Sequence, residues 1–274
     1  MLLRTIAGAS LLLAAVWFAY LDAALWLLPV MFCGAYAVLF LLAFLFLCAV
    51  CAVVDLDKPQ EHDSKFYRTV MHLYIEALIS LVRLKVEVSG LEKTPKEGRF
   101  LLVCNHQNES DPGILLHYFK KSQLAFISKR ENATMFAVGK FMHKIMCQLV
   151  NRENDREALK TILKCIQLIR DDEVSIGAFP EGGILVENKL SHFRSGMFKI
   201  AQKTGVPIVV CTLKGTSDLF RNLKRLKPTH VRLHLVDVIP AEEVKGANTV
   251  ELGDRIYNMM LADLGPEYAL EQEL

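Results

Sequence analysis

This chain of 274 residues lacks a large excess of either charge, because it contains 32 Lys and Arg and 30 Asp and Glu. A net charge of +2 lacks the basic excess typical of nucleic-acid-binding proteins, so we expect no nucleic-acid partner. Internal repeats and low-complexity segments are also missing. Hydrophobic residues make up 52% of the chain, which is too many for a disordered protein. These features predict a globular protein with one sizeable core.

Cysteine clusters with metal-ligand spacing are absent as well. Cys33, Cys48 and Cys51 lie in the apolar N-terminal segment, and the other cysteines are scattered through apolar strands and helices. Cys48 and Cys51 have C-x-x-C spacing, but inside an apolar segment they are better interpreted as small buried hydrophobes than as a redox or metal site. We therefore predict neither a metal nor a cofactor.

Charge is absent from residues 25–54, a segment long enough to cross a bilayer as a helix. Residues 2–21 form a second candidate, interrupted only by Arg4, and Asp22 lies in the predicted turn. We expect residues 1–54 to form a membrane anchor of two spans; a cleaved signal peptide or a single span is the alternative. Basic residues flank the outer ends of the pair but not the turn, which predicts that the following domain lies on the cytoplasmic face.

Residues 55–84 predict a polar linker followed by an amphipathic helix. Apolar residues recur at helical spacing from Phe66 to Leu81, while Arg68 and most other charged residues fall on the remaining face. Packing on the domain is the ordinary explanation for such a helix, and lying in the membrane interface is the alternative.

From residue 85 onward, apolar strand segments alternate with helical segments. The predicted strands are 85–88, 100–104, 124–128, 148–151, 174–179, 206–213 and 231–238. The predicted helices are 113–121, 134–147, 155–170, 196–204 and 249–264. This alternation predicts a single α/β domain over residues 85–274, with a mixed, largely parallel sheet flanked by helices.

The polar segment Asn105-His106-Gln107-Asn108-Glu109-Ser110-Asp111 follows a predicted strand and precedes a predicted helix with Asp111 at its cap. Open α/β sheets bind ligands at the carboxyl ends of their strands. A carboxylate that accepts from one imidazole nitrogen leaves the other free as a general base. The H-x4-D spacing by itself also fits a loop histidine held by a helix-cap aspartate, so the context must decide between the two interpretations.

A second polar cluster, Pro180-Glu181-Gly182-Gly183, follows the strand at 174–179. Its glycines allow backbone N–H groups to approach an anion closely; the alternative is a tight turn with an exposed glutamate. Arg194 precedes a predicted helix and is well placed to hold an anion that the helix end also attracts.

The ordered segments "NHQNESD", "SKREN", "VNR", "FPEGG", "FRSG" and "VPIVV" resemble the glycerolipid acyltransferase family, most of all its bacterial 1-acylglycerol-3-phosphate acyltransferases. The resemblance covers about residues 85–215 and implies that residues 85–274 are an acyltransferase domain. It implies transfer of an acyl group from acyl-CoA or acyl carrier protein to the hydroxyl of lysophosphatidate, which makes phosphatidate in phospholipid synthesis. The implied partners are these donors, a lysophospholipid acceptor and membrane lipid.

The same resemblance implies roles for individual residues. His106 would be the general base, and Asp111 would orient it and stabilise its imidazolium. The implied substrate-binding residues are Glu181, Gly182 and Gly183 of the F-P-E-G block and the basic residues Lys129, Arg152 and Arg194.

The sequence departs from the family pattern at two places. Gly183 and Ile184 stand where Thr and Arg are common, and Val210 stands where Pro is common. The first departure leaves glycerol 3-phosphate or another lysophospholipid open as the acceptor. A serine hydrolase lacks support because no G-x-S-x-G segment occurs, and a non-catalytic membrane scaffold would need neither His106 nor Asp111.

Overall fold

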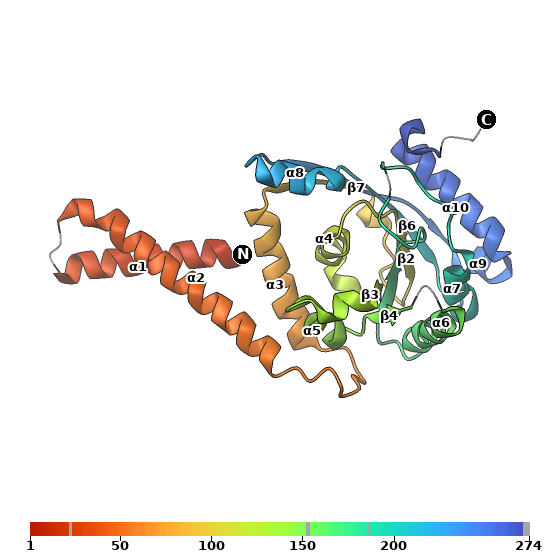
Figure 1. Cartoon of the computed structure of the whole chain (residues 1–274), viewed down its shortest axis with the longest axis horizontal. Coiled ribbons are helices and arrows are strands. Elements are labelled where there is room, and N and C mark those ends of the chain that lie inside the picture. The colour runs from red at the N-terminus through yellow and green to blue at the C-terminus, as the bar shows by residue number, and fades with distance from the viewer. Residues whose placement is uncertain (22–23, 152–153, 186, 271–274) are drawn as a thin grey trace.

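The computed structural model describes residues 1–21, 24–151, 154–185 and 187–270. Two apolar helices, α1 (Leu2–Leu21) and α2 (Leu28–Ala52), form a hairpin that projects from the rest of the molecule (Figure 1). The stretches Leu2–Leu21 and Leu25–Ala52 are long and apolar enough to cross a membrane, judged by length and composition. Asp22, which the sequence places in the turn, lies outside the described residues.

Helix α3 (Lys65–Leu81) connects this hairpin to the α/β domain. The hydroxyl of Tyr67 donates a hydrogen bond to the carbonyl oxygen of Val50 over 3.2 Å, and the hydroxyl of Tyr74 donates to that of Ala43. The predicted amphipathic helix is therefore present, and one of its faces packs along α2.

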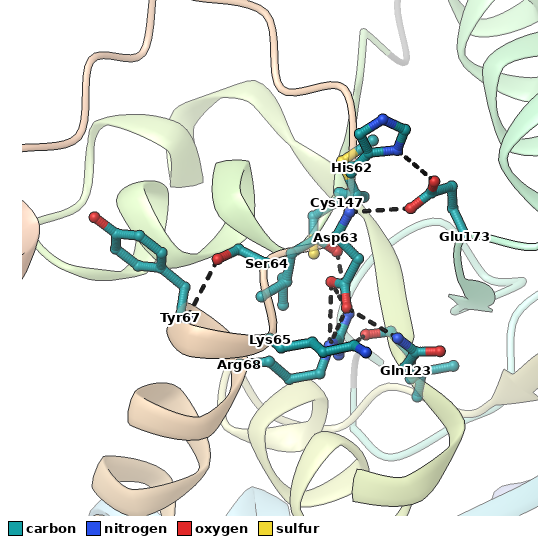
Figure 2. A network of polar contacts seen from close by, with 12 residues as sticks. His62, Asp63, Ser64, Lys65, Tyr67, Arg68, Gln123, Cys147 and Glu173 are labelled. Carbon is teal, nitrogen blue, oxygen red and sulfur yellow. Dashed lines mark hydrogen bonds and ion pairs between the residues drawn. The ribbon is translucent and has the colours of Figure 1, made fainter.

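Arg68 is buried at the start of α3, although the sequence pattern predicted it on the polar face (Figure 2). Its Nη2 lies 2.6 Å from Oδ1 of Asp63, and the two side chains are only 7% and 3% exposed. Nη1 of Arg68 also donates to the carbonyl of Leu124, over 2.9 Å, while Glu173 accepts from the backbone N–H of Asp63 over 3.1 Å. A buried ion pair is tolerated when additional hydrogen bonds satisfy both charges. Tertiary contacts with the sheet thus override the helical pattern and fasten α3 to the domain.

A seven-stranded sheet forms the centre of the domain, in the order β1-β7-β6-β2-β5-β3-β4. All neighbouring strands are parallel except β6 and β7, so the predicted mixed, largely parallel sheet is confirmed. The strands are β1 (Leu84–Ser89), β2 (Leu101–Cys104), β3 (Leu124–Lys129), β4 (Gln148–Val150), β5 (Ser175–Ala178), β6 (Ile208–Lys214) and β7 (Thr229–Ile239).

Helices cover both faces of this sheet (Figure 1). They are α4 (Asp111–Tyr118), α5 (Val138–Lys144), α6 (Asp155–Arg170), α7 (Lys199–Thr204), α8 (Leu219–Lys224), α9 (Ala241–Gly246) and α10 (Thr249–Leu264). One core lies between the sheet and α6, α7 and α10, and the other between the sheet and α3, α4 and α5. Because both faces are covered, β2 and β5 are buried along their whole length.

The helix predictions differ from the structure in three respects. The segment predicted as a helix over 196–204 begins as a 3-10 helix, Ser195–Phe198, and α7 starts only after it. Helices α8 and α9 were not predicted, because six residues are too few to establish a helical period. The predicted helix over 134–147 is shorter, since Ala137 has a φ of 48° and the helix begins only at Val138.

Candidate active site

The two polar clusters leave the sheet at the same edge. Strands β2 and β5 are parallel neighbours, and Val103 is paired with Ala178. The chain after Cys104 and the chain after Ala178 therefore emerge side by side, which places the turns at 105–111 and 180–183 together. This is the edge at which open α/β sheets bind ligands.

Asp111 holds the first of these turns through one carboxylate oxygen. Its Oδ2 lies 3.0 Å from Nδ1 of His106 and accepts from the backbone N–H groups of Gln107, over 2.6 Å, and Asn108, over 2.8 Å. The carboxylate is 0% exposed and the imidazole 14%. Asp111 is the first residue of α4 and follows the cap residue Ser110, so the predicted cap position was wrong by one residue.

This arrangement leaves the second imidazole nitrogen available. A carboxylate that accepts at Nδ1 selects the tautomer with a proton on Nδ1 and a lone pair on Nε2. Within the part of the chain that the structure describes, nothing forms a hydrogen bond with Nε2 of His106. The geometry therefore suits His106 to general-base chemistry.

An aromatic column supports the imidazole from behind. The ring of His106 stacks on that of Phe179, with centroids 4.1 Å apart and planes 17° from parallel. Phe179 in turn stacks on Phe126 at 5.4 Å. A Cβ at Gly177 would lie 2.6 Å from the Phe126 ring, so this position needs glycine. The sequence pattern predicted Phe179 only as the end of a strand, because no neighbouring residue indicates a ring contact with His106.

Glu181 is buried beside the His106–Asp111 turn, which excludes the alternative of a tight turn with an exposed glutamate. Neither carboxylate oxygen has a hydrogen-bond partner of good geometry among the described residues. Burial and, to a smaller extent, the charge of Asp111 raise the pKa of Glu181 to about 8, although the backbone N–H groups of Glu181 and His106 oppose the rise. Glu181 is thus a carboxyl group with unused hydrogen-bonding capacity at the strand ends.

Gly182 and Arg194 pack directly against each other. Gly182 has a φ of +74°, and a Cβ placed on it would lie 2.6 Å from Nε of Arg194. The backbone N–H of Arg194 donates to the carbonyl of Pro180 over 2.9 Å. The Arg194 side chain is exposed, and its guanidinium makes no hydrogen bond or ion pair with a described residue. The guanidinium of Arg194 therefore lies against the F-P-E-G turn with its N–H donors available to bind an anion.

The other predicted site residues differ in their exposure and in their distance along the sheet from the His106 turn. Gly183 is half-buried beside Glu181, and Leu185, two residues further on, donates its backbone N–H to the carbonyl of His106 over 2.7 Å. Lys129 is exposed at the end of β3, one strand beyond β5. Arg152 lies outside the described residues.

Gln107 has a structural role that sequence analysis missed. Its Nε2 donates to the hydroxyl of Tyr268 over 3.0 Å and to Oδ1 of Asn188 over 3.2 Å. Its Oε1 accepts from the backbone N–H of Gly215 over 3.0 Å. Gln107 therefore links the turn that carries His106 to three distant segments. No local pattern could have revealed Tyr268, which lies 161 residues away.

A half-buried histidine held by a buried aspartate at the carboxyl edge of a mostly parallel sheet is an arrangement suited to an α/β enzyme that uses a general base. Residues 85–214 match the family model described as Acyltransferase. Residues 85–214 are therefore similar in sequence to this family.

Individual relatives and one solved structure are also similar to this chain. Over 178 residues the chain is 32% identical to a probable 1-acyl-sn-glycerol-3-phosphate acyltransferase of Mycoplasma pneumoniae, and the match covers 63% of this chain and 64% of that protein. It is 28% identical over 187 residues to the 1-acyl-sn-glycerol-3-phosphate acyltransferase of Borreliella burgdorferi, covering 67% and 74%. The crystal structure of the 1-acyl-sn-glycerophosphate acyltransferase PlsC from Thermotoga maritima has the same fold, with a TM-score of 0.60, 22% identity, and coverage of 70% and 76%. The chain thus spans slightly less than two thirds of the Mycoplasma protein.

Proposed function

We propose that this protein is an O-acyltransferase that moves a fatty acyl group from a thioester to the hydroxyl of lysophosphatidate and so forms phosphatidate. The observation that carries the proposal is the Asp111 carboxylate, which occupies Nδ1 of His106 and leaves Nε2 without a partner among the described residues. The names of the relatives support the choice of substrate.

In this mechanism His106 first accepts a proton and then donates the same proton to the leaving group. Its Nε2 takes the proton from the acceptor hydroxyl while the hydroxyl oxygen attacks the thioester carbonyl. The tetrahedral intermediate then collapses, the C–S bond breaks, and the proton passes from the imidazolium to the departing thiolate. Asp111 stabilises the imidazolium with its buried negative charge. The donor is acyl-CoA or acylated acyl carrier protein, and coenzyme A or the carrier protein leaves as a free thiol.

Glu181, Gly182 and Gly183 would position the acceptor, and Arg194 would bind its phosphate. A guanidinium can hold a phosphate through two hydrogen bonds. Lys129 and Arg152 are the further basic residues proposed at the rim of this pocket. Ile184 supplies no charge where the family commonly has Arg, so glycerol 3-phosphate and other lysophospholipids belong in the same acceptor panel.

The test uses the full-length protein in lipid nanodiscs with defined donors and acceptors. Release of free thiol measures turnover, and mass spectrometry identifies the acylated product. We expect lysophosphatidate to be acylated with either thioester, and His106→Ala to lower turnover by about 10²–10⁴-fold, because positioned acid–base catalysis contributes about that much. Asp111→Asn should also lower turnover severely while the protein stays folded.

His230→Ala is the matched control, because His230 is exposed on β7 and should be dispensable. Full turnover by a folded His106→Ala protein would refute the mechanism. Thiol release without an acylated product would instead identify a thioesterase.

We also propose that α1 and α2 anchor the protein in a membrane, with residues 85–274, the acyltransferase domain, on the cytoplasmic face. The two apolar helices and the basic residues at their outer ends support this orientation. A cysteine introduced at the exposed Lys203 of α7 should resist a membrane-impermeant thiol reagent in intact cells and react after lysis. Labelling in intact cells would contradict the orientation.

A further inference from the structure

Helix α8 and the turn after it expose an unusual number of apolar side chains. Phe220 is 53% exposed, Leu223 39% and Leu226 76%. These residues are spaced three apart, which places the two helical ones on one side of α8. We call residues 220–227 the α8 patch.

The α8 patch continues onto the end of α3. The guanidinium of Arg83 donates a hydrogen bond to the carbonyl of Leu226, and the carbonyl of Arg83 accepts from the backbone N–H of Thr229. On α3, Leu78 is 57% and Leu81 49% exposed. Figure 1 shows α8 at the end of the domain from which the α1–α2 hairpin projects. The exposed apolar surface therefore lies on the same side as the two apolar helices.

Leu226 occupies a backbone conformation that its side chain disfavours. Its φ is 54°, in the left-handed region that glycine and asparagine adopt at much lower cost. Its side chain is also mostly exposed, so it contributes little to the core. Folding alone would favour glycine here, and a contact outside the chain is the simplest reason for leucine.

The charge of the α8 patch is of one sign. From Leu219 to Val236 the chain contains no acidic residue. Arg221 is paired with Asp218 at 2.7 Å. The exposed side chains of Lys224, Arg225 and Lys227 make no hydrogen bond or ion pair with any residue in the described part of the chain. Exposed apolar side chains interleaved with unpaired cations are complementary to an anionic lipid surface.

We propose that the α8 patch is a second membrane contact, in which Leu223 and Leu226 enter the interface and the basic side chains bind anionic headgroups. The proposal rests on the placement of the α1–α2 hairpin in the membrane, not on the acyl-transfer chemistry. A hairpin alone leaves the domain free to tilt, whereas a second contact near α3 fixes its orientation. Each basic side chain near an anionic surface should favour the docked orientation by roughly fivefold.

An environment-sensitive fluorophore attached to a cysteine tests the contact in the full-length protein in nanodiscs. Leu223→Cys carries the probe in a chain in which Cys33 and Cys48 are replaced by Ala. Leu163→Cys is the matched control, because Leu163 is 55% exposed, is flanked by Lys160 and Lys164, and lies on α6 away from the hairpin (Figure 1). A separate chain labelled at the exposed Cys33, with Cys48→Ala, reports whether the hairpin itself is in the bilayer.

With anionic lipid, we expect the probe at 223 to shift to the blue and to be quenched by headgroup-labelled lipid, while the probe at 163 stays solvent-like. High salt should weaken the effect, because it screens exposed charges. Changing Lys224, Arg225 and Lys227 together to Gln should lower the ratio of docked to undocked protein by roughly 100-fold, at about fivefold per charge.

Leu226→Gly separates docking from backbone strain. It should raise thermal stability by relieving the strained turn, and it should reduce quenching at 223. Equal signals at 223 and 163, while the probe at Cys33 is lipid-exposed, would overturn the proposal. A blue shift that needs no anionic lipid and grows with protein concentration would also overturn it, because it would assign the α8 patch to a second copy of the chain. So would quenching that Leu226→Gly leaves unchanged.

Discussion

Replacing Glu181 by Gln should change how the stability of this protein depends on pH. The Glu181 carboxyl is buried, and neither oxygen has a hydrogen-bond partner of good geometry among the described residues, although the backbone N–H groups of Glu181 and His106 favour its charged form. Burial raises its pKa from 4.5 to about 8. Below pH 4.5 the carboxyl is protonated in both the folded and the unfolded chain, and it causes no pH dependence.

Between pH 4.5 and about 8, the carboxyl is ionised in the unfolded chain but still protonated in the folded one. The folded state then binds the extra proton, so the free energy of unfolding falls as the pH rises through this window. At about 1.4 kcal/mol per pH unit, the loss reaches at most about 5 kcal/mol and levels off above pH 8. Gln has no proton to lose and avoids the whole penalty.

Thermal unfolding of the full-length protein in one detergent, measured at pH 5 and pH 8.5, checks this reasoning. The free-energy difference between the two pH values is about 4 kcal/mol, which corresponds to roughly 8–16 °C for a domain of this size. Glu181→Gln should therefore gain about that much in Tm over the wild type at pH 8.5 and little at pH 5.

The exposed Glu187 provides the control, and Glu187→Gln should follow the wild type at both pH values. If the Tm difference between Glu181→Gln and the wild type is the same at pH 5 and pH 8.5, Glu181 is not an uncompensated buried carboxyl. Its proposed availability to the acceptor would then lose its basis.

Two further predictions concern side chains around the proposed pocket. Arg194→Ala should lower acceptor kcat/KM by roughly 10- to 150-fold and leave donor KM nearly unchanged, since a hydrogen bond to a charged group contributes about 1.5–3 kcal/mol. The control is Arg156→Ala, at an exposed position on α6, which should have no effect. Unchanged acceptor kinetics in Arg194→Ala would argue against a phosphate monoester acceptor. Tyr268→Phe removes the 3.0 Å hydrogen bond to Gln107 and should lower kcat by roughly 2- to 10-fold with a smaller change in KM, because a neutral hydrogen bond contributes about 0.5–1.5 kcal/mol. Tyr257→Phe serves as its control. Equal kinetics for the two tyrosine variants would show that the hydrogen bond from Gln107 to Tyr268 is not required to position the turn that carries His106.

Local sequence patterns were sufficient to predict the strands and most of the longer helices. Apolar segments bounded by turn residues predicted every strand of the sheet. The run in β2 is continuous because that strand is buried on both faces, whereas less exposed and more exposed residues alternate along β1 and most of β7. Helix α6 begins at the predicted residue, Asp155, and the side chain of Asn154 caps it. His106 and Asp111 lie in one turn, so their contact needs only local geometry. The resemblance of the surrounding segments pointed to the family whose model residues 85–214 match.

Tertiary structure decided what lies next to that turn. Strand order is not encoded in hydrophobic periodicity, and only the pairing of β2 with β5 brings Glu181 to His106. The burial that raises the pKa of Glu181 follows from that packing. The ring of Phe179 behind the imidazole also depends on strand order.

Packing also overruled local patterns elsewhere. Helical periodicity predicted Arg68 on a polar face, but the carboxylate of Asp63 and the carbonyl of Leu124 stabilise it in the interior. Helix α8 was too short to be predicted, and its significance depends on its position beside the end of α3. Helical periods and caps depend on near neighbours and can be read along the chain. A buried charge, a supporting ring or an exposed patch depends on residues that only the folded chain brings together.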